Sequence, residues 1–146
     1  MTKRVVLRPE PWAWPGPRVL LEQPYGRETQ ARVDALRRAG YAVAVCPGPT
    51  AEDRCPLAGD EGCAAAHGAD IVVSSLGLET AEARDALSAL HERLPRMPTL
   101  VEADPGASAR WPDLVREADR LESGIGADAL VDRVGAALER RLQSLA

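Results

Sequence analysis

The chain has 146 residues and a formal net charge of −4; it contains no phenylalanine, and its only lysine is Lys3. This length suits one domain that folds without disulfides or metal ions. The acidic balance, with basic residues mixed among acids, argues against a nucleic-acid surface, which needs clustered positive charge. No apolar run approaches the roughly 20 residues that a helix needs to span a bilayer. The apolar run near the amino terminus is also too short for the core of a signal peptide. We therefore expect a cytoplasmic protein with reduced cysteines that binds neither nucleic acid nor membrane.

The first 17 residues are expected to form an extended arm. Residues 9–17 contain four prolines around Trp12 and Trp14. Proline fixes φ, removes a hydrogen-bond donor and biases the preceding residue to extended geometry, so a helix is excluded here. The tryptophans either cover their own domain or bind a partner, and both interpretations stay open. We divide the chain into an arm at 1–17 and a domain at 18–146.

The first half of the domain alternates between strand and helix patterns. A strand is expected at 18–23, a helix at 27–39 with apolar residues at helical spacing before Gly40, and a second strand at 41–46. Residues 47–68 are rich in proline and glycine, which leaves room for one or two helical turns at 60–67. The apolar run Ile71-Val72-Val73 within 69–77 is typical of a central strand covered on both faces.

The second half repeats the alternation. Thr80 is suited to cap a helix that runs to Leu94, and a strand follows at 99–102. Asp104, Pro105 and Gly106 indicate a turn, after which Pro112 favours a short helix at 111–118. A weak edge strand is expected at 120–122. The last helix, at 127–145, is expected to bury a stripe made of Leu130, Val131, Val134, Leu138, Leu142 and Leu145.

This alternation predicts an α/β fold in which a doubly wound, five-stranded parallel sheet lies between helices. Open α/β sheets bind ligands at the carboxyl ends of their strands. The polar residues expected there are Glu22, Ser74, Ser75, Glu102 and Asp104. No histidine is expected near the two serines, so hydrolase chemistry is disfavoured.

Three stretches together resemble a response-regulator receiver domain over residues 18–142. Residues 36–43 (LRRAGYAV) resemble that family's first-helix exit into the second strand, residues 69–76 (ADIVVSSL) resemble its third strand, and residues 127–138 resemble its fifth helix. The resemblance implies a flavodoxin-like three-layer sandwich. It also implies a role in signal transduction.

The resemblance places four site positions on residues that lack the expected chemistry. The phosphoacceptor aspartate matches Ser75, and the acidic pair that holds Mg²⁺ matches Glu22 and Gln23. The switch hydroxyl matches Ala103, and the lysine that pairs with the phosphoryl group matches Ser123. A serine without a neighbouring base cannot replace a carboxylate in an acyl phosphate. We therefore expect a degenerate pseudo-receiver that is not phosphorylated at the usual residue.

The cysteine spacing suggests a separate chemistry in residues 46–67. Cys46, Cys55, Cys63 and His67 have the residue types of a closed structural zinc site, with a slightly long middle gap. A disulfide between Cys55 and Cys63 is an alternative, and three unlinked thiols are another. No cofactor is expected beyond this open possibility of zinc.

The function predicted from these observations is a non-catalytic signalling or regulatory module that binds a protein partner or forms a homodimer. Receivers signal through the fourth helix, fifth strand and fifth helix, which corresponds here to the region from Trp111 to Leu145. The Trp12/Trp14 arm is a second candidate surface. Two alternatives remain: a small-molecule binder at the carboxyl edge of the sheet, and a thiol or zinc sensor in the 46–67 loop.

Overall fold

The computed structural model describes residues 16–50, 52–59 and 62–145. The expected arm, with Trp12 and Trp14, lies almost entirely outside the described residues. Among the described residues, no helix has the length and apolar character needed to cross a membrane.

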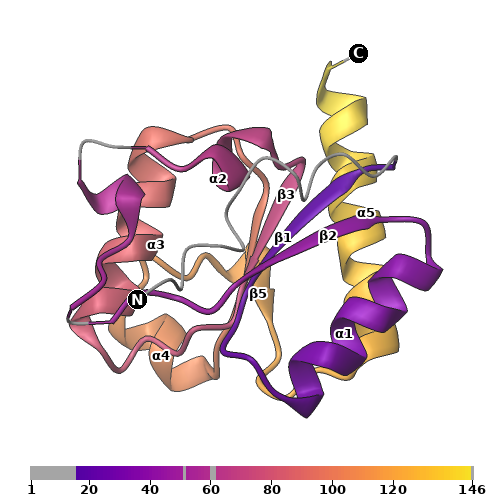
Figure 1. Ribbon diagram of the computed structural model, residues 1–146. Helices are drawn as coiled ribbons and strands as arrows, with labels where there is room; N and C mark the ends of the chain where they lie inside the picture. Colours follow the sequence, from indigo (N-terminus) through magenta and orange to yellow (C-terminus); the bar gives the residue numbers. More distant parts are fainter. Residues whose placement is uncertain (1–15, 51, 60–61, 146) are drawn as a thin grey trace.

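The structure confirms a five-stranded, all-parallel sheet with the order β2-β1-β3-β4-β5 (Figure 1). The strands are β1 (Arg18–Glu22), β2 (Ala42–Cys46), β3 (Ile71–Ser74), β4 (Thr99–Glu102) and β5 (Arg120–Leu121). All four residues of β3 are buried, as the unbroken apolar run predicted. The third strand therefore lies at the centre of the sheet, and its carboxyl end is flanked by those of β1 and β4.

Helices cover both faces of the sheet (Figure 1). One face is packed against α1 (Arg27–Arg38) and α5 (Ala127–Leu145). The other is packed against α2 (Ala64–Gly68), α3 (Ala81–Arg93), α4 (Pro105–Arg110) and the 3-10 helix η3 (Pro56–Ala58). A second 3-10 turn, η4 (Glu117–Asp119), precedes β5.

Side-chain alternation along each strand decides which face a residue meets. In β1, Val19 and Leu21 belong to the core beneath α1 and α5, whereas Leu20 belongs to the core beneath α2 and α3. Continuing this alternation places Glu22 on the α2/α3 face and Gln23 on the α1/α5 face. The matching acidic-pair positions are thus separated by the sheet.

Several expected helix boundaries are confirmed. Thr80 accepts a hydrogen bond from the Ala83 amide at 3.2 Å and caps α3. Gly40 follows the end of α1 with φ of 100°, a conformation that glycine adopts without strain. The short helix expected at 60–67 is present as α2, which begins at Ala64.

The helix expected at 111–118 is wrong, because the helical turns form earlier. Asp104 accepts from the Ala107 amide at 2.8 Å and Pro105 occupies the first turn, so the predicted turn triplet instead starts α4. Trp111 already lies at the carboxyl-terminal cap of this helix. A capping aspartate followed by proline suits a turn and a helix start equally well, and the pattern alone did not distinguish them.

The expected burial of Leu142 is also wrong. Leu130 and Val134 of α5 are fully buried, but Leu142 is 68% exposed. Figure 1 shows the reason: the last turns of α5 extend beyond the edge of the sheet, where no strand lies beneath them.

Candidate functional site

A buried arginine of α1 occupies the carboxyl edge of the sheet. Arg32 is 1% exposed, and its guanidinium forms a two-pronged ion pair with Glu102 at the end of β4. Nη1 donates to Glu102 Oε1 at 2.7 Å, and Nη2 donates to Oε2 at 3.1 Å. This planar, charge-assisted geometry is among the stronger side-chain interactions in proteins.

The same guanidinium joins three other segments. Nη1 donates to Gln23 Oε1 at 3.0 Å and to Ser75 Oγ at 3.3 Å, and Nη2 donates to the Ile125 carbonyl at 2.8 Å. Arg32 therefore connects α1 to the ends of β1, β3 and β4 and to the loop before α5. We call Arg32, Glu102, Gln23 and Ser75 the Arg32 cluster.

Glu102 is held ionised by its surroundings. Its partial burial would raise the pKa, but hydrogen bonds from Arg32, Ser75 and the Gly124 amide outweigh this effect and hold the pKa of Glu102 below its ordinary value. The Gly124 amide donates to Oε2 at 2.7 Å. A cation and an anion that share this network compensate each other in the interior.

Glu22 has a different environment on the other face of the sheet. Its side chain is 6% exposed, and burial raises its pKa to about 7 despite a hydrogen bond with Ser74. Within the described part of the chain, Oε1 of Glu22 has no hydrogen-bond partner. Glu22 is therefore a desolvated carboxyl without a compensating cation, and near neutral pH it exchanges its proton.

The positions matched to a receiver site are divided between the two faces of the sheet. Glu22 and Glu102 lie on opposite faces of the sheet, and Glu102 is already paired with Arg32. Ala103 is buried and offers no hydroxyl, whereas Ser123 is exposed. A pair of free carboxylates suited to Mg²⁺ is therefore not assembled by these residues.

The crevice expected for a small molecule is also divided. Ser75 and Glu102 both accept hydrogen bonds from Arg32 within the Arg32 cluster. Ser74 is hydrogen-bonded to Glu22 on the opposite face of the sheet. Asp104 caps α4. The structure thus argues against the small-molecule alternative at this edge.

The cysteine loop places its thiols in the core. Cys63 is buried, and Cys46 and Cys55 pack against the same apolar cluster beneath α2 and α3. None of the three forms a disulfide. Burial raises the pKa of Cys46 to about 12 and also raises that of Cys55, so both are weak nucleophiles at neutral pH.

The four predicted zinc ligands differ in their exposure to solvent. Cys63 is the N-cap of α2, and its carbonyl accepts a hydrogen bond from the His67 amide at 3.0 Å. His67 is exposed, whereas the thiols face the core. Within residues 16–50, 52–59 and 62–145, no group of three or more His, Cys, Asp or Glu is placed to hold a metal ion. The remaining histidine, His91, is half-buried, and its Nε2 lies 3.1 Å from the Leu114 carbonyl oxygen.

Sequence reasoning missed Arg32, although a signal was present. Thr29, Val33 and Leu36 define the buried stripe of α1, and Arg32 falls on the same stripe at helical spacing. An arginine on a buried face needs a carboxylate. Glu102, at the end of β4, is that carboxylate.

Comparison with known proteins identifies the fold. No protein-family model matches the chain, and no curated protein matches its sequence. Solved structures do match: a CheY-like response regulator receiver domain protein from Methanospirillum hungatei has a TM-score of 0.66 at 14% identity, covering 89% of this chain and 99% of that one.

Two further structures agree. A response regulator receiver domain protein from Clostridium thermocellum has a TM-score of 0.63 at 15% identity, covering 87% of this chain and 98% of that one. The Francisella response regulator 1452 receiver domain has a TM-score of 0.62 at 16% identity, covering 86% and 98%. By fold, this chain is therefore similar to response-regulator receiver domains.

Proposed function

We propose that the protein is a non-catalytic pseudo-receiver, a regulatory interaction module that is not phosphorylated on the residue matching the phosphoacceptor. The observation that carries this proposal is the Arg32 cluster. Ser75 stands at the phosphoacceptor position, and the guanidinium of Arg32 occupies the space beside it with its own carboxylate partner, Glu102.

In the proposed module, a permanent ion pair takes the place of a transient phosphoryl group. A phosphorylated receiver changes state because new charges recruit a hydroxyl and a cation. Here Glu102, Arg32 and the loop at Gly124 and Ile125 are already joined. The proposed module therefore holds one conformation of this edge without a phosphodonor.

The proposed interaction surface is the region from Trp111 to Leu145, which binds a second copy or another protein. Two features support it. The guanidinium groups of Arg84 and Arg110 lie over the ring of Trp111, at 5.1 and 4.9 Å from its centroid. Leu142 is one of two large apolar side chains exposed among the described residues, the other being Tyr25. The Trp12/Trp14 arm remains a second proposed contact.

The absence of phosphorylation is tested by incubating the protein with acetyl phosphate and Mg²⁺ and measuring its intact mass. We expect no added phosphoryl group, while an active receiver treated in parallel gains one. A Ser75→Asp variant restores one carboxylate but neither the lysine nor a pair of free acids, so we expect it to stay unlabelled too. Labelling of the wild type that is lost on replacing Glu22 or Asp104 would overturn the proposal.

A further inference from the structure

A groove of about 440 Å³ lies at the amino edge of the sheet, between the residues that lead into β1 and the outer end of α5. Leu138 and Leu142 are four residues apart, so they share one face of the helix. Leu138 is half-buried and Leu142 is 68% exposed. The residues that line the groove are Gly16, Pro17, Asp70, Leu138, Arg141 and Leu142.

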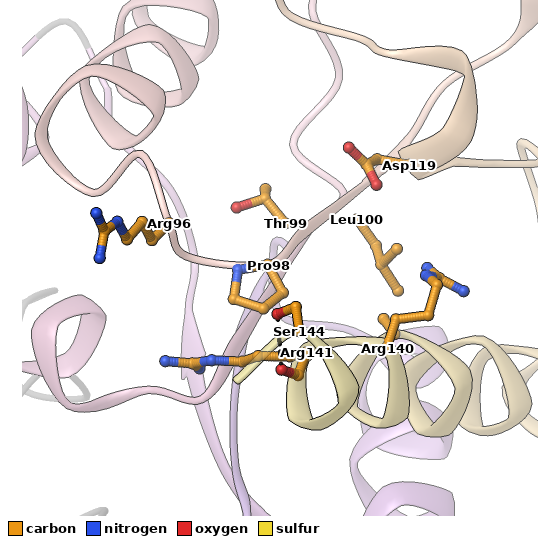
Figure 2. A pocket seen from close by; sticks show the side chains of 9 residues that line it. Arg96, Pro98, Thr99, Leu100, Asp119, Arg140, Arg141 and Ser144 are labelled. Atoms are coloured by element: carbon orange, nitrogen blue, oxygen red, sulfur yellow. Dashed lines mark hydrogen bonds between the residues drawn. The ribbon is translucent and has the colours of Figure 1, made fainter. Parts of the chain in front are cut away.

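Two polar contacts fix the shape of this groove. Asp70 Oδ2 accepts a hydrogen bond from the Arg18 amide at 2.8 Å, and Arg141 Nη1 donates to the Asp70 carbonyl at 2.7 Å. Figure 2 shows the same turn of α5, with the Arg141 side chain extending away from Arg140. The groove therefore combines exposed apolar side chains with one guanidinium that is held in place, a surface on which an aromatic ring packs well.

Gly16 fixes the point at which the preceding residues leave the domain. Its φ is 111°, and a side chain at this position would collide with the Gly40 carbonyl, so the chain passes close to the turn between α1 and β2. An extended chain spans at most about 3.5 Å per residue, which keeps the Cα atom of Trp14 within about 7 Å of that of Gly16. Because Gly16 itself lines the groove, the indole of Trp14 has the groove within reach.

The sequence around Trp14 favours docking over a free arm. Pro15 biases Trp14 to extended geometry, so few conformations are lost when the side chain is immobilised. An indole buries about 150–250 Å² of largely apolar surface, and its face attracts a guanidinium. Residues 9–17 carry one charge, Glu10, so docking Trp14 does not require a buried ion.

We propose that the Trp14 side chain docks in this groove of its own chain, against Pro17 and Leu142 and beside Arg141. A short tether gives such a segment an effective concentration in the millimolar range, above that of most separate partners. Trp12, two residues further from the groove, stays free for the second proposed contact.

Docking also bears on assembly. Leu142 belongs to the proposed interaction surface, so Trp14 competes with a second copy for the end of α5. This consequence rests on the proposed function, whereas the docking itself does not. The arm then acts as an intramolecular cap that a partner must displace.

Tryptophan fluorescence of the full chain tests the docking. The double variant Trp12→Phe/Trp111→Phe leaves Trp14 as the only tryptophan. We expect its emission at a shorter wavelength than in urea, with reduced quenching by acrylamide, because an apolar groove shields the indole. Adding Leu142→Gln should move the emission toward the value in urea.

Matched controls keep this test specific. A chain whose only tryptophan is Trp12 should emit close to its value in urea, and adding Tyr25→Gln to the Trp14 protein should change nothing. Tyr25 and Leu142 are both exposed, so neither substitution should lower the unfolding midpoint. The proposal is overturned if Trp14 emits as in urea, if Leu142→Gln has no effect, or if the shift disappears on dilution, which would place Trp14 in the groove of a second copy.

Sedimentation velocity of full-length Trp14→Ala and Trp12→Ala tests the competition. If docking leaves the groove open about a tenth of the time, Trp14→Ala should tighten dimerisation roughly tenfold, and Trp12→Ala should not tighten it. An unchanged or weaker dimer of Trp14→Ala would overturn the competition. Monomers in every protein would overturn the homodimer alone, since the fluorescence of a monomer reports the docking.

Discussion

At the scale of single residues, the two glutamates at the carboxyl edge show how strand alternation assigns chemistry. Glu102 faces α1 and meets Arg32, and its pKa is lowered. Glu22 faces the other core, where burial raises its pKa to about 7. The same residue type at the ends of β1 and β4, the two strands that flank β3, is thus a permanent anion in one place and a titrating acid in the other.

Replacing Arg32 by methionine should destabilise the protein by about 3–5 kcal/mol. The change leaves Glu102 without its cation and removes the hydrogen bonds that Arg32 donates to four other segments. Arg38→Met removes an exposed arginine from the same helix and should change stability by less than about 0.5 kcal/mol. Urea denaturation of both variants measures the difference. A loss of under about 1 kcal/mol for Arg32→Met would show that the cluster contributes little.

Glu22 should make the stability depend on pH. The folded pKa of about 7 lies above the ordinary 4.5, so the native state binds more protons between these values. Stability from this group is therefore complete below pH 4.5 and falls as the pH rises through 7. At about 1.4 kcal/mol per pKa unit, the loss is about 3 kcal/mol.

Urea denaturation of Glu22→Gln at pH 5 and pH 8 tests this dependence. The variant should lie within about 1 kcal/mol of the wild type at pH 5 and exceed it at pH 8 by up to about 3 kcal/mol. Glu122→Gln, at an exposed position, is the control and should follow the wild type at both values. A wild type as stable at pH 8 as at pH 5, relative to Glu22→Gln, would contradict the assigned titration.

At the scale of elements, α3 and α4 depend on different sources of stability. Both begin with a capping side chain, Thr80 and Asp104 respectively. α3 buries Ala83, Ala86, Leu87 and Leu90, whereas α4 has six residues and buries none of them. Short helices rarely persist without packing or caps, so α4 relies on Asp104 and Pro105.

Asp104→Ala should therefore open α4 locally, while Thr80→Ala should weaken the whole fold slightly. Each lost cap costs about 1 kcal/mol. Amide hydrogen exchange is expected to show lost protection at residues 107–110 in Asp104→Ala and an intact α3 in Thr80→Ala. Unchanged protection of α4 in Asp104→Ala would mean that other contacts hold this helix.

At the scale of the whole molecule, the exposed end of α5 bears on assembly. Leu142 is 68% exposed on a helix that extends past the sheet (Figure 1). Single exposed leucines are common, so its significance depends on the surrounding surface. It lies within the proposed interaction region, whereas Tyr25, 59% exposed, lies outside it, just before α1.

Multi-angle light scattering over a range of concentrations tests self-association through this surface. We expect wild-type dimers, a monomeric Leu142→Glu variant, because a charge cannot be buried unpaired at an interface, and an unaffected Tyr25→Glu control. A wild type that stays monomeric at high concentration would contradict the homodimer. Equal effects of both variants would place the contact elsewhere.

The sequence by itself determined the order of strands and helices, the parallel sheet and its central strand, because hydrophobic periodicity and cap residues are local signals. It also predicted that Ser75, Ala103 and Ser123 lack receiver chemistry, since residue identity alone decides which groups are present. The start of α4 at Pro105 was ambiguous, because a turn and a helix begin with the same residues.

Only the tertiary structure decided which partners the charged side chains at the carboxyl edge of the sheet have. Arg32 and Glu102 are 70 residues apart, and their pairing depends on the packing of α1 against the sheet. Strand alternation then separated Glu22 from Glu102, and the end of the sheet left Leu142 exposed. Contacts between distant segments, and the face on which each side chain lies, come from packing and so are invisible to local sequence patterns.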